Sequence, residues 1–291
     1  GSPEITETIQ TPIRDAFEKE YPDIKVKLMF VAGGQYFDKL LTMIAGGTPP
    51  DVFAFHETFK LDYPTRGIVL NLQPLMERDN FDLDKYYDIS VDPFKYKGDL
   101  YGLPWGGTMT LVTTFYNMNL FDEAGVSYPD ETWTWDTFLD SAKKITKEVK
   151  GRTTQWGFCS DKGLPWWTNF VWQNEGSIFN KEGTKCTLDE PAAYEALQWY
   201  ADLANKHGVS PKPSYSADMG GMMQMFTTGK VAMVNGAPWM VPTFKTIKDF
   251  EWDVAVPPKG KTRACLVCGS GFAISPDSKY IDASWEFLKF A

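Results

Sequence analysis

Helical and strand-like periodicities alternate through the first part of the chain. Between residues 4 and 20, apolar side chains recur at every fourth position: Ile5, Ile9, Ile13 and Phe17. This spacing predicts an amphipathic helix, which Tyr21-Pro22 ends. Residues 24–31 alternate between apolar and polar side chains and predict a strand. A second helix is predicted at 36–45 and a short buried strand at 52–55, and the order α-β-α-β is typical of a parallel sheet covered by helices.

The rest of the chain predicts a crossing segment followed by a mostly helical region. Residues 100–116 lack a helical period and are interrupted by Pro104 and a glycine pair, which suits a crossing between lobes. Helices are predicted at 134–149, capped by Thr134, and at 191–206. The apolar face expected for 191–206 comprises Tyr194, Leu197, Ala201 and Ala204. A strand at 266–275 and a helix at 281–290 complete the pattern.

The length of the chain favours two lobes. Its 291 residues exceed one average domain of about 100–200 residues. With the crossing segments as boundaries, we expect an N-terminal lobe at 1–109, a C-terminal lobe at 110–267, and a return to the N-terminal lobe at 268–291. Hinge strands are expected at 107–113 and 266–269.

Composition and charge exclude several classes of protein. The chain has 29 Lys+Arg against 38 Asp+Glu, a formal charge of −9, and its basic residues are scattered, so nucleic acid is not an expected partner. The longest apolar runs are far shorter than the roughly 20 residues that a membrane helix needs. Cys265 and Cys268 form a CxxC pair without a second pair or a nearby histidine, so we expect structural thiols, no metal site and no cofactor.

Aromatic residues are unusually frequent. They make up 15% of the chain, with 11 Trp, 13 Tyr and 20 Phe. Indole and phenol rings offer flat apolar faces with a polar edge, which suits the apolar faces of pyranose rings surrounded by hydroxyls. The surplus therefore favours a carbohydrate ligand, although core packing accounts for most of these rings.

Several segments together resemble the extracellular solute-binding protein family 1, which includes the maltose- and other oligosaccharide-binding proteins. The most recognisable is 39–52, with its turn Gly46-Gly47-Thr48-Pro49-Pro50-Asp51. The other matching segments follow in the family's order: 17–26, 101–104, 115–117, 120–125, 133–138, 226–233, 269–275 and 283–290. The family starts with a strand before the first helix and continues beyond the helix at 283–290, so we expect this chain to lack that strand and the C-terminal part.

The resemblance implies both a fold and a function. The fold is the α/β two-lobe fold of type II periplasmic binding proteins, each lobe a mostly parallel sheet flanked by helices. The function is that of the substrate-binding subunit of an ABC importer, a monomer without enzymatic activity. Such a subunit captures an oligosaccharide in the cleft between the lobes and delivers it to the transmembrane permease subunits. The family also implies a location outside the cell membrane, either periplasmic or as a lipoprotein anchored to its outer face.

Candidate ligand-binding residues lie beside turns at the ends of predicted strands, where this fold presents side chains to its cleft. The resemblance implies that one or both indoles of Trp166 and Trp167, and that of Trp239, stack on sugar. Hydrogen-bonding groups are expected to surround them. The remaining candidates follow the strand at 52–55 or lie in the two crossings: Phe55, His56, Glu57, Trp105, Thr110 and Ser270.

Two alternatives remain open at this point. The same fold binds other solutes, such as polyamines, metal ions or peptides, but the tryptophan-rich turns favour sugar over these. A glycoside hydrolase would need two carboxylates facing each other across the scissile bond, and acidic residues are too numerous for the sequence to exclude such a pair. The sequence contains no G-x-S-x-G or H-E-x-x-H motif, and it has only two histidines.

Overall fold

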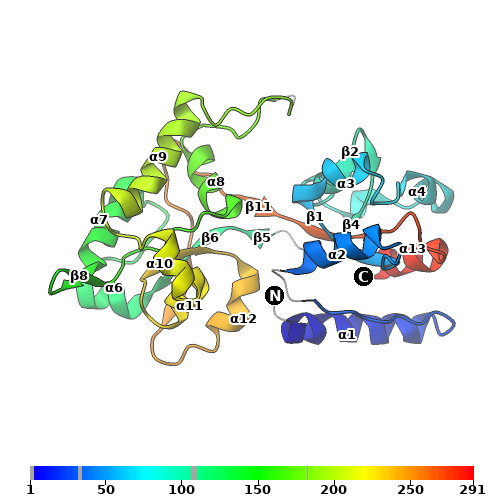
Figure 1. Cartoon of the computed structure of the whole chain (residues 1–291), viewed down its shortest axis with the longest axis horizontal. Coiled ribbons are helices and arrows are strands. Elements are labelled where there is room, and N and C mark those ends of the chain that lie inside the picture. The colour runs from blue at the N-terminus through cyan, green and yellow to red at the C-terminus, as the bar shows by residue number, and fades with distance from the viewer. Residues whose placement is uncertain (1–2, 32–34, 106–109, 182) are drawn as a thin grey trace. The chain divides into compact units, whose positions relative to one another are not determined.

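The computed structural model describes residues 3–31, 35–105, 110–181 and 183–291. It divides the chain into two compact units (Figure 1). Unit 1 comprises Gly1–Met109 and Cys268–Ala291, and unit 2 comprises Thr110–Val267. Strands β5 (Thr110–Leu111) and β11 (Val267–Cys268), which adjoin the two boundaries, pair with each other. The first unit is therefore built from two separate stretches of sequence.

Unit 1 contains a three-stranded sheet in the order β1-β12-β4. The strands are β1 (Val52–His56), β4 (Leu103–Pro104) and β12 (Ser270–Ile274). Helices α1 (Pro3–Glu20) and α2 (Tyr36–Ala45) match the helices predicted there. The remaining elements of the unit are α3 (Asp62–Thr65), α4 (Gln73–Asp79), α5 (Asp88–Val91), α13 (Ile281–Phe290), the turns η2 (Glu57–Phe59), η3 (Leu83–Lys85) and η4 (Asp92–Phe94), and the hairpin β2 (Lys95–Tyr96) and β3 (Asp99–Leu100).

The prediction of mostly parallel sheets is wrong for the two three-stranded sheets of the described residues, in which neighbouring strands are antiparallel. Strand β12 pairs antiparallel with β1 and with β4, so these two strands are parallel to each other but are not neighbours. The physical reason is the route of the chain: β12 enters unit 1 directly after the crossing at Val267, beside the end of β1, where His56 faces Ser270. It must then run back along β1 in the opposite direction.

The strand predicted at 24–31 is also wrong. These residues form no ladder within the described part of the chain. Their backbone instead has local partners: Val26 N donates to Glu18 Oε1 at 2.8 Å, and Ile24 N donates to the carbonyl of Tyr21 at 3.0 Å. Alternating polarity describes the two faces of an extended segment, but a strand also needs a neighbouring strand for its backbone groups.

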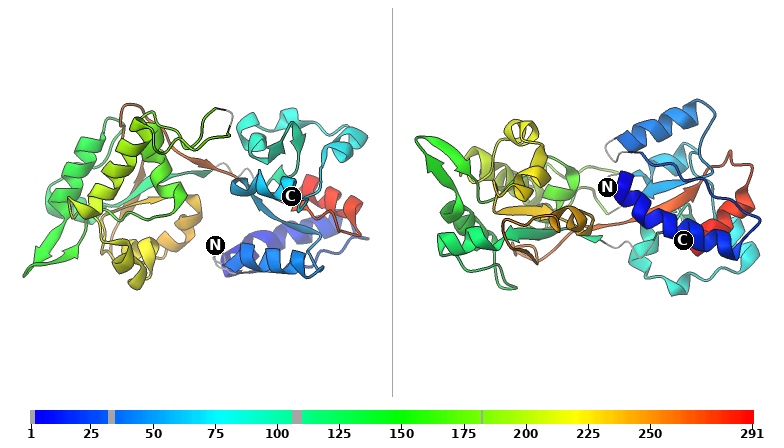
Figure 2. Two further views of the ribbon diagram at one scale, coloured as in Figure 1. Left: turned by 45° about the horizontal axis from the view of Figure 1, so that its top comes forward. Right: turned by 90° about the horizontal axis from the view of Figure 1, so that it is seen from below.

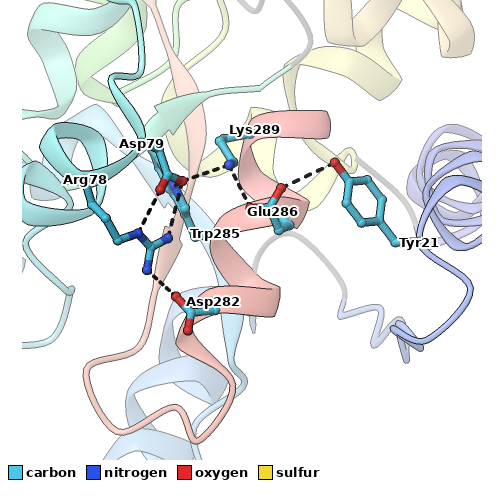
Figure 3. Close-up of polar contacts among 7 residues, drawn as sticks. All are labelled: Tyr21, Arg78, Asp79, Asp282, Trp285, Glu286 and Lys289. Atoms are coloured by element: carbon cyan, nitrogen blue, oxygen red, sulfur yellow. Dashed lines mark hydrogen bonds and ion pairs between the residues drawn. The ribbon is translucent and has the colours of Figure 1, made fainter.

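Helix α13 is held in unit 1 by its apolar face and by a polar network (Figure 3). The Trp285 ring is fully buried, and its Nε1 donates to Asp79 Oδ2 at 2.8 Å. Lys289 Nζ donates to the same oxygen at 3.0 Å. On the other side of the helix, the Tyr21 hydroxyl donates to Glu286 at 3.3 Å. The second stretch of unit 1 is thereby joined to α4 and α1 of the first stretch.

Unit 2 contains a three-stranded sheet in the order β10-β6-β9, again antiparallel. Its strands are β6 (Thr113–Asn117), β9 (Met233–Gly236) and β10 (Trp252–Ala255), and two parallel bridges, at Trp156–Val231 and Cys159–Val234, extend it beside β9. The views of Figure 2 show the helices around this sheet. The other elements are α6 (Met118–Ala124), α7 (Trp135–Ile145), α8 (Leu164–Gln173), α9 (Pro191–Asn205), α10 (Pro213–Asp218), α11 (Gly221–Thr227), α12 (Val241–Phe244), η5 (Pro238–Met240) and the hairpin β7 (Lys147–Val149) and β8 (Arg152–Gln155).

Two helical predictions in unit 2 need correction. Thr134 caps α7 through a capping box with Thr137, as predicted, but the helix ends at Ile145 and the chain continues into β7. In α9 the buried face is Ala193, Ala196, Tyr200 and Leu203, one position away from the predicted face. Tyr194, which was expected in the core, is 59% exposed. Helix α9 packs against α8, and the packing, not the periodicity alone, decides which face of α9 is buried.

Candidate functional site

Four predicted residues of unit 1, His56, Glu57, Trp105 and Ser270, lie at one end of its sheet. His56, the last residue of β1, faces Ser270 of β12 in the ladder. Trp105 follows β4, and its backbone N donates to the carbonyl of Ser270 at 3.1 Å. Residues separated by more than 200 positions in sequence are therefore neighbours because β12 lies between β1 and β4. We call His56, Glu57, Trp105 and Ser270 the unit 1 cluster.

Glu57 gives the unit 1 cluster its chemistry. Its side chain is 18% exposed, its Oε2 accepts a hydrogen bond from Gly269 N at 2.9 Å, and this oxygen lies 3.5 Å from His56 Nδ1. Burial raises the pKa of Glu57 to about 7, although backbone N–H donors, including Gly269, oppose that shift. Burial also lowers the pKa of His56. At neutral pH, the cluster can accept a hydrogen bond from a ligand hydroxyl or donate one to it.

Aromatic rings also belong to or adjoin the unit 1 cluster. The Trp105 ring lies 5.7 Å from that of Phe272, and its buried Nε1 has no hydrogen-bond partner among the described residues. The Phe37 ring lies 6.4 Å from that of His56 and 4.6 Å from that of Phe59. Phe37 was not among the predicted site residues, because the sequence places it only in the predicted helix at 36–45.

Two other candidates of the sequence analysis have different surroundings. Phe55 is 0% exposed and packs against Tyr63 and Phe94 in the core of unit 1. The strand alternation places Phe53 and Phe55 on the inner face and His56 on the other, a signal that the prediction could have used. Thr110 begins β5, but its side chain lies outside the described part of the structure, as do residues 107–109 of the predicted hinge.

In unit 2, two of the three predicted tryptophans lie side by side. The centroids of the Trp166 and Trp239 rings are 6.4 Å apart, and their planes are inclined by 51°. Trp166 lies in the first turn of α8: Gly163 is the N-cap, and Pro165 occupies a position where helices accept proline. Trp239 lies in η5, directly after the buried strand β9, as predicted, and is 39% exposed. We call these two rings the indole pair.

Local structure keeps Trp166 in place. Tyr200, which is buried, accepts a hydrogen bond from Asp161 N and donates one to the Asp161 carbonyl, both at 2.9 Å. Asp161 Oδ1 in turn accepts from Gly163 N at 2.9 Å. The Trp166 indole covers Gly163 so closely that a Cβ there would lie 2.9 Å from its Cδ1 and Nε1. Tyr200 was not among the predicted site residues because its hydrogen bonds join it to Asp161, which is distant in sequence.

Trp167 does not belong to the indole pair. Successive helical residues point about 100° apart, so Trp167 faces away from Trp166. Its ring is partly buried and packs against the larger hydrophobic core of unit 2, around Tyr116, Phe170 and Tyr200. Trp166 packs instead against the core around Phe115 and Met240.

Other features offer less for ligand binding. A pocket of about 460 Å³ in unit 2 is lined mostly by apolar side chains such as Leu111 and Val254, together with Arg263, and contains none of the predicted site residues. The described residues include no group of three or more His, Cys, Asp or Glu side chains that could hold a metal ion. Cys159 is buried, and burial raises its pKa to about 11. No described helix is both long enough and apolar enough to cross a membrane.

Comparison with known proteins identifies relatives along nearly the whole chain. The arabinooligosaccharide-binding protein of Bacillus subtilis is 29% identical over 290 residues, which cover 94% of this chain and 64% of the relative. An ABC substrate-binding protein from Listeria monocytogenes, solved in complex with cycloalternan, has a TM-score of 0.86 and 32% identity, covering 96% of this chain and 71% of that one. A solute-binding protein from Thermotoga lettingae bound with α-D-tagatose has a TM-score of 0.84 and 25% identity, covering 99% and 73%.

The resemblance seen in separate sequence segments thus holds along nearly the whole chain and also for the fold. The chain spans less than two thirds of the length of its Bacillus subtilis relative. The solved relatives confirm the α/β two-lobe fold of periplasmic binding proteins. The family model for bacterial extracellular solute-binding proteins matches residues 2–291. The chain therefore belongs to the bacterial extracellular solute-binding protein family.

Proposed function

We propose that this chain is the substrate-binding subunit of an ABC importer and that its ligand is an oligosaccharide. The observation that carries the proposal is the indole pair, whose rings lie 6.4 Å apart with one partly exposed. Relatives that bind arabinooligosaccharide and cycloalternan support a carbohydrate ligand. In this proposal the ligand is taken up outside the cell membrane and handed to the permease subunits, without chemical change.

The two clusters supply complementary chemistry for such a ligand. The indole pair offers apolar area to the faces of pyranose rings. The unit 1 cluster offers the carboxyl of Glu57, the imidazole of His56 and the buried Trp105 Nε1–H as hydrogen-bond partners for sugar hydroxyls. Ligand pockets typically combine a large apolar surface with a few such polar groups, which set orientation and specificity. Each cluster is by itself a proposed sugar contact within its own unit.

The direct test is titration calorimetry with a panel of ligands. The panel comprises arabino-, malto- and manno-oligosaccharides, the corresponding monosaccharides, and spermidine, ferric citrate and a tripeptide as non-sugar solutes. We expect binding of at least one oligosaccharide, and mass spectrometry should recover that sugar uncut after long incubation. Binding of spermidine, iron or peptide with no saccharide bound would overturn the sugar assignment, and cleavage of the sugar would overturn the assignment as a receptor without catalysis.

A pair of aromatic substitutions tests the indole pair. Trp239→Ala should weaken oligosaccharide binding by at least about tenfold, because buried aromatic contacts carry a large share of binding energy. Its partly exposed ring contributes little to the core, so the thermal midpoint should change little. Tyr194→Ala removes another exposed aromatic ring of unit 2 and serves as the control, with unchanged affinity. Equal affinities of Trp239→Ala and the wild type would contradict the proposed role.

A further inference from the structure

The side chain of Asn235 connects the two elements that carry the indole pair. Asn235 lies in β9, opposite Thr114 of β6, and is only 3% exposed. Its Nδ2 donates a hydrogen bond to the carbonyl oxygen of Trp166 at 2.9 Å. Trp239 follows four residues later in the same segment. One buried amide thus joins the first turn of α8 to the strand that leads into η5.

The segment between Asn235 and Trp239 has little freedom. A Cβ at Gly236 would lie 2.6 Å from the ring of Phe115, so the backbone packs directly on that ring. Ala237 and Met240, on either side of Trp239, are buried. The position of the Trp239 backbone therefore follows that of β9, and Asn235 transmits this position to α8.

Apart from the packing of Trp166 on Gly163 and against the core around Phe115 and Met240, the two indole rings have few constraints on their mutual geometry. Trp239 is 39% exposed, so the core does not enclose its ring. A backbone carbonyl has two lone pairs, so the Trp166 oxygen can accept from Asn235 in addition to a helical N–H. A buried donor that loses its acceptor is costly, which keeps this hydrogen bond intact.

We propose that Asn235 is a positioning residue: the hydrogen bond from its amide to the Trp166 carbonyl sets the spacing and inclination of the two indoles that receive the ligand. The geometric part of this inference concerns unit 2 alone. Its consequence for affinity rests on the proposed sugar-binding function. The two parts can be tested separately.

The geometry is tested by circular dichroism. Two indoles 6.4 Å apart and inclined by 51° couple their electronic transitions, which gives a pair of circular dichroism bands of opposite sign, here called the couplet. The couplet is obtained by subtracting the spectrum of Trp239→Phe from that of the wild type. Asn235→Ala should change this couplet. The matched control is Asn174→Ala at the other end of α8, where a buried Nδ2 donates to the Ala192 carbonyl at 2.7 Å. The control should lose stability but keep the couplet.

Affinity is tested by a double-mutant cycle with arabinotriose and maltotriose as probes, well below the unfolding midpoint. Asn235→Ala should weaken binding of the probe that the wild type binds by about 5- to 30-fold. In the Trp239→Phe background the same substitution should cost much less, because Asn235 acts through the pair. Independent, multiplicative losses would overturn the proposal.

The remaining outcomes also decide the question. An unchanged couplet in Asn235→Ala overturns the positioning role even if affinity falls, and a changed couplet with unchanged affinity overturns its importance for binding. If Asn235→Ala does not fold, Asn235→Ser, whose side chain is one bond shorter, takes its place with the same expected result. A wild type that binds no saccharide would refute the proposed function, while the couplet would still test the geometry.

Discussion

Glu57 shows how one buried side chain can give a site its pH dependence. It accepts a hydrogen bond from Gly269 N, and it lies 3.5 Å from the imidazole Nδ1 of His56, whose own pKa is lowered by burial. A carboxyl in such surroundings is more stable protonated than it is in water. The same side chain is therefore both a proposed ligand contact and a source of pH-dependent stability.

Replacing Glu57 should change how stability depends on pH. The pKa of Glu57 is about 7 in the folded protein, above the value of about 4.3 expected when unfolded. Its contribution to stability is thus fully present below about pH 4 and is lost as the pH rises through about 7. The free energy of unfolding of Glu57→Gln, relative to that of the wild type, should therefore rise by on the order of 2 kcal/mol as the pH increases from about 5 to 8. Urea unfolding at each pH measures this difference.

The control for this prediction is Glu18→Gln. The hydrogen bond from Val26 N lowers the pKa of Glu18, so its contribution to stability is present above the unfolded pKa and is lost only in more acidic solution. The stability difference between Glu18→Gln and the wild type should therefore stay constant over the same pH range. A constant difference for Glu57→Gln as well would show that Glu57 does not titrate as described.

At the scale of elements, β12 and α13 matter most, because this late stretch of sequence completes unit 1. Strand β12 lies between β1 and β4, and the buried face of α13 packs in the same core. Each of these two elements makes one contact that a substitution should disrupt at a clear cost in stability. These contacts can be tested against close neighbours that lack them.

Gly271 should tolerate no side chain. A Cβ at this position would lie 2.3 Å from the carbonyl oxygen of Leu103, across the β12–β4 ladder. Gly271→Ala should destabilise the protein by about 3 kcal/mol, because the backbone of β4 must move. At Gly269, two residues earlier, the nearest atom to an added Cβ is 3.9 Å away, so Gly269→Ala should cost less than about 1 kcal/mol. Chemical denaturation of both variants gives the comparison, and equal losses would contradict it.

Asp79 should contribute more to the stability of the protein than the ion pairs around it suggest. It accepts from the buried indole N–H of Trp285 and from Lys289 (Figure 3), so Asp79→Ala leaves a buried donor without its acceptor. Asp282 pairs only with Arg78 in this network and is largely exposed, which makes Asp282→Ala the control. Asp79→Ala should lower the urea midpoint clearly and Asp282→Ala hardly at all. A similar shift in both would mean that the Trp285 hydrogen bond contributes nothing.

At the scale of the whole molecule, each unit has a hydrophobic core of its own. One cluster of buried residues, around Phe55 and Trp285, belongs to unit 1, and two clusters, around Phe138 and Phe226, belong to unit 2. Units with separate cores can unfold in separate steps. Ligand binding then stabilises whichever units the ligand contacts.

Calorimetric unfolding should therefore report which units bind the sugar. An oligosaccharide at about 100 times its Kd stabilises the binding-competent state by about 2.7 kcal/mol. If both clusters contact the ligand, the transitions of both units should shift upward. A sugar from the panel that does not bind is the control. A shift confined to the transition of unit 2 would remove the unit 1 cluster from the proposed site.

The sequence by itself determined the features that depend on neighbouring residues. Helices α1, α2 and α13 follow from their own periodicity and from stop signals such as Gly46-Gly47, and the cap at Thr134 is a local hydrogen bond. The matching segments pointed to the family because their order along the chain is itself sequence information. His56 and Trp239 could be located because His56 ends a strand with buried residues and Trp239 follows the buried strand β9 after two residues.

Only the tertiary structure decided which distant residues meet. The direction of β12, the missing ladder at 24–31 and the buried face of α9 all depend on partners far away in sequence. The same holds for the pairing of Trp166 with Trp239 while Trp167 packs elsewhere, since consecutive tryptophans look alike in the sequence. Periodicity predicts that a helix or strand has an inner and an outer face. Packing decides which neighbouring element covers the inner face.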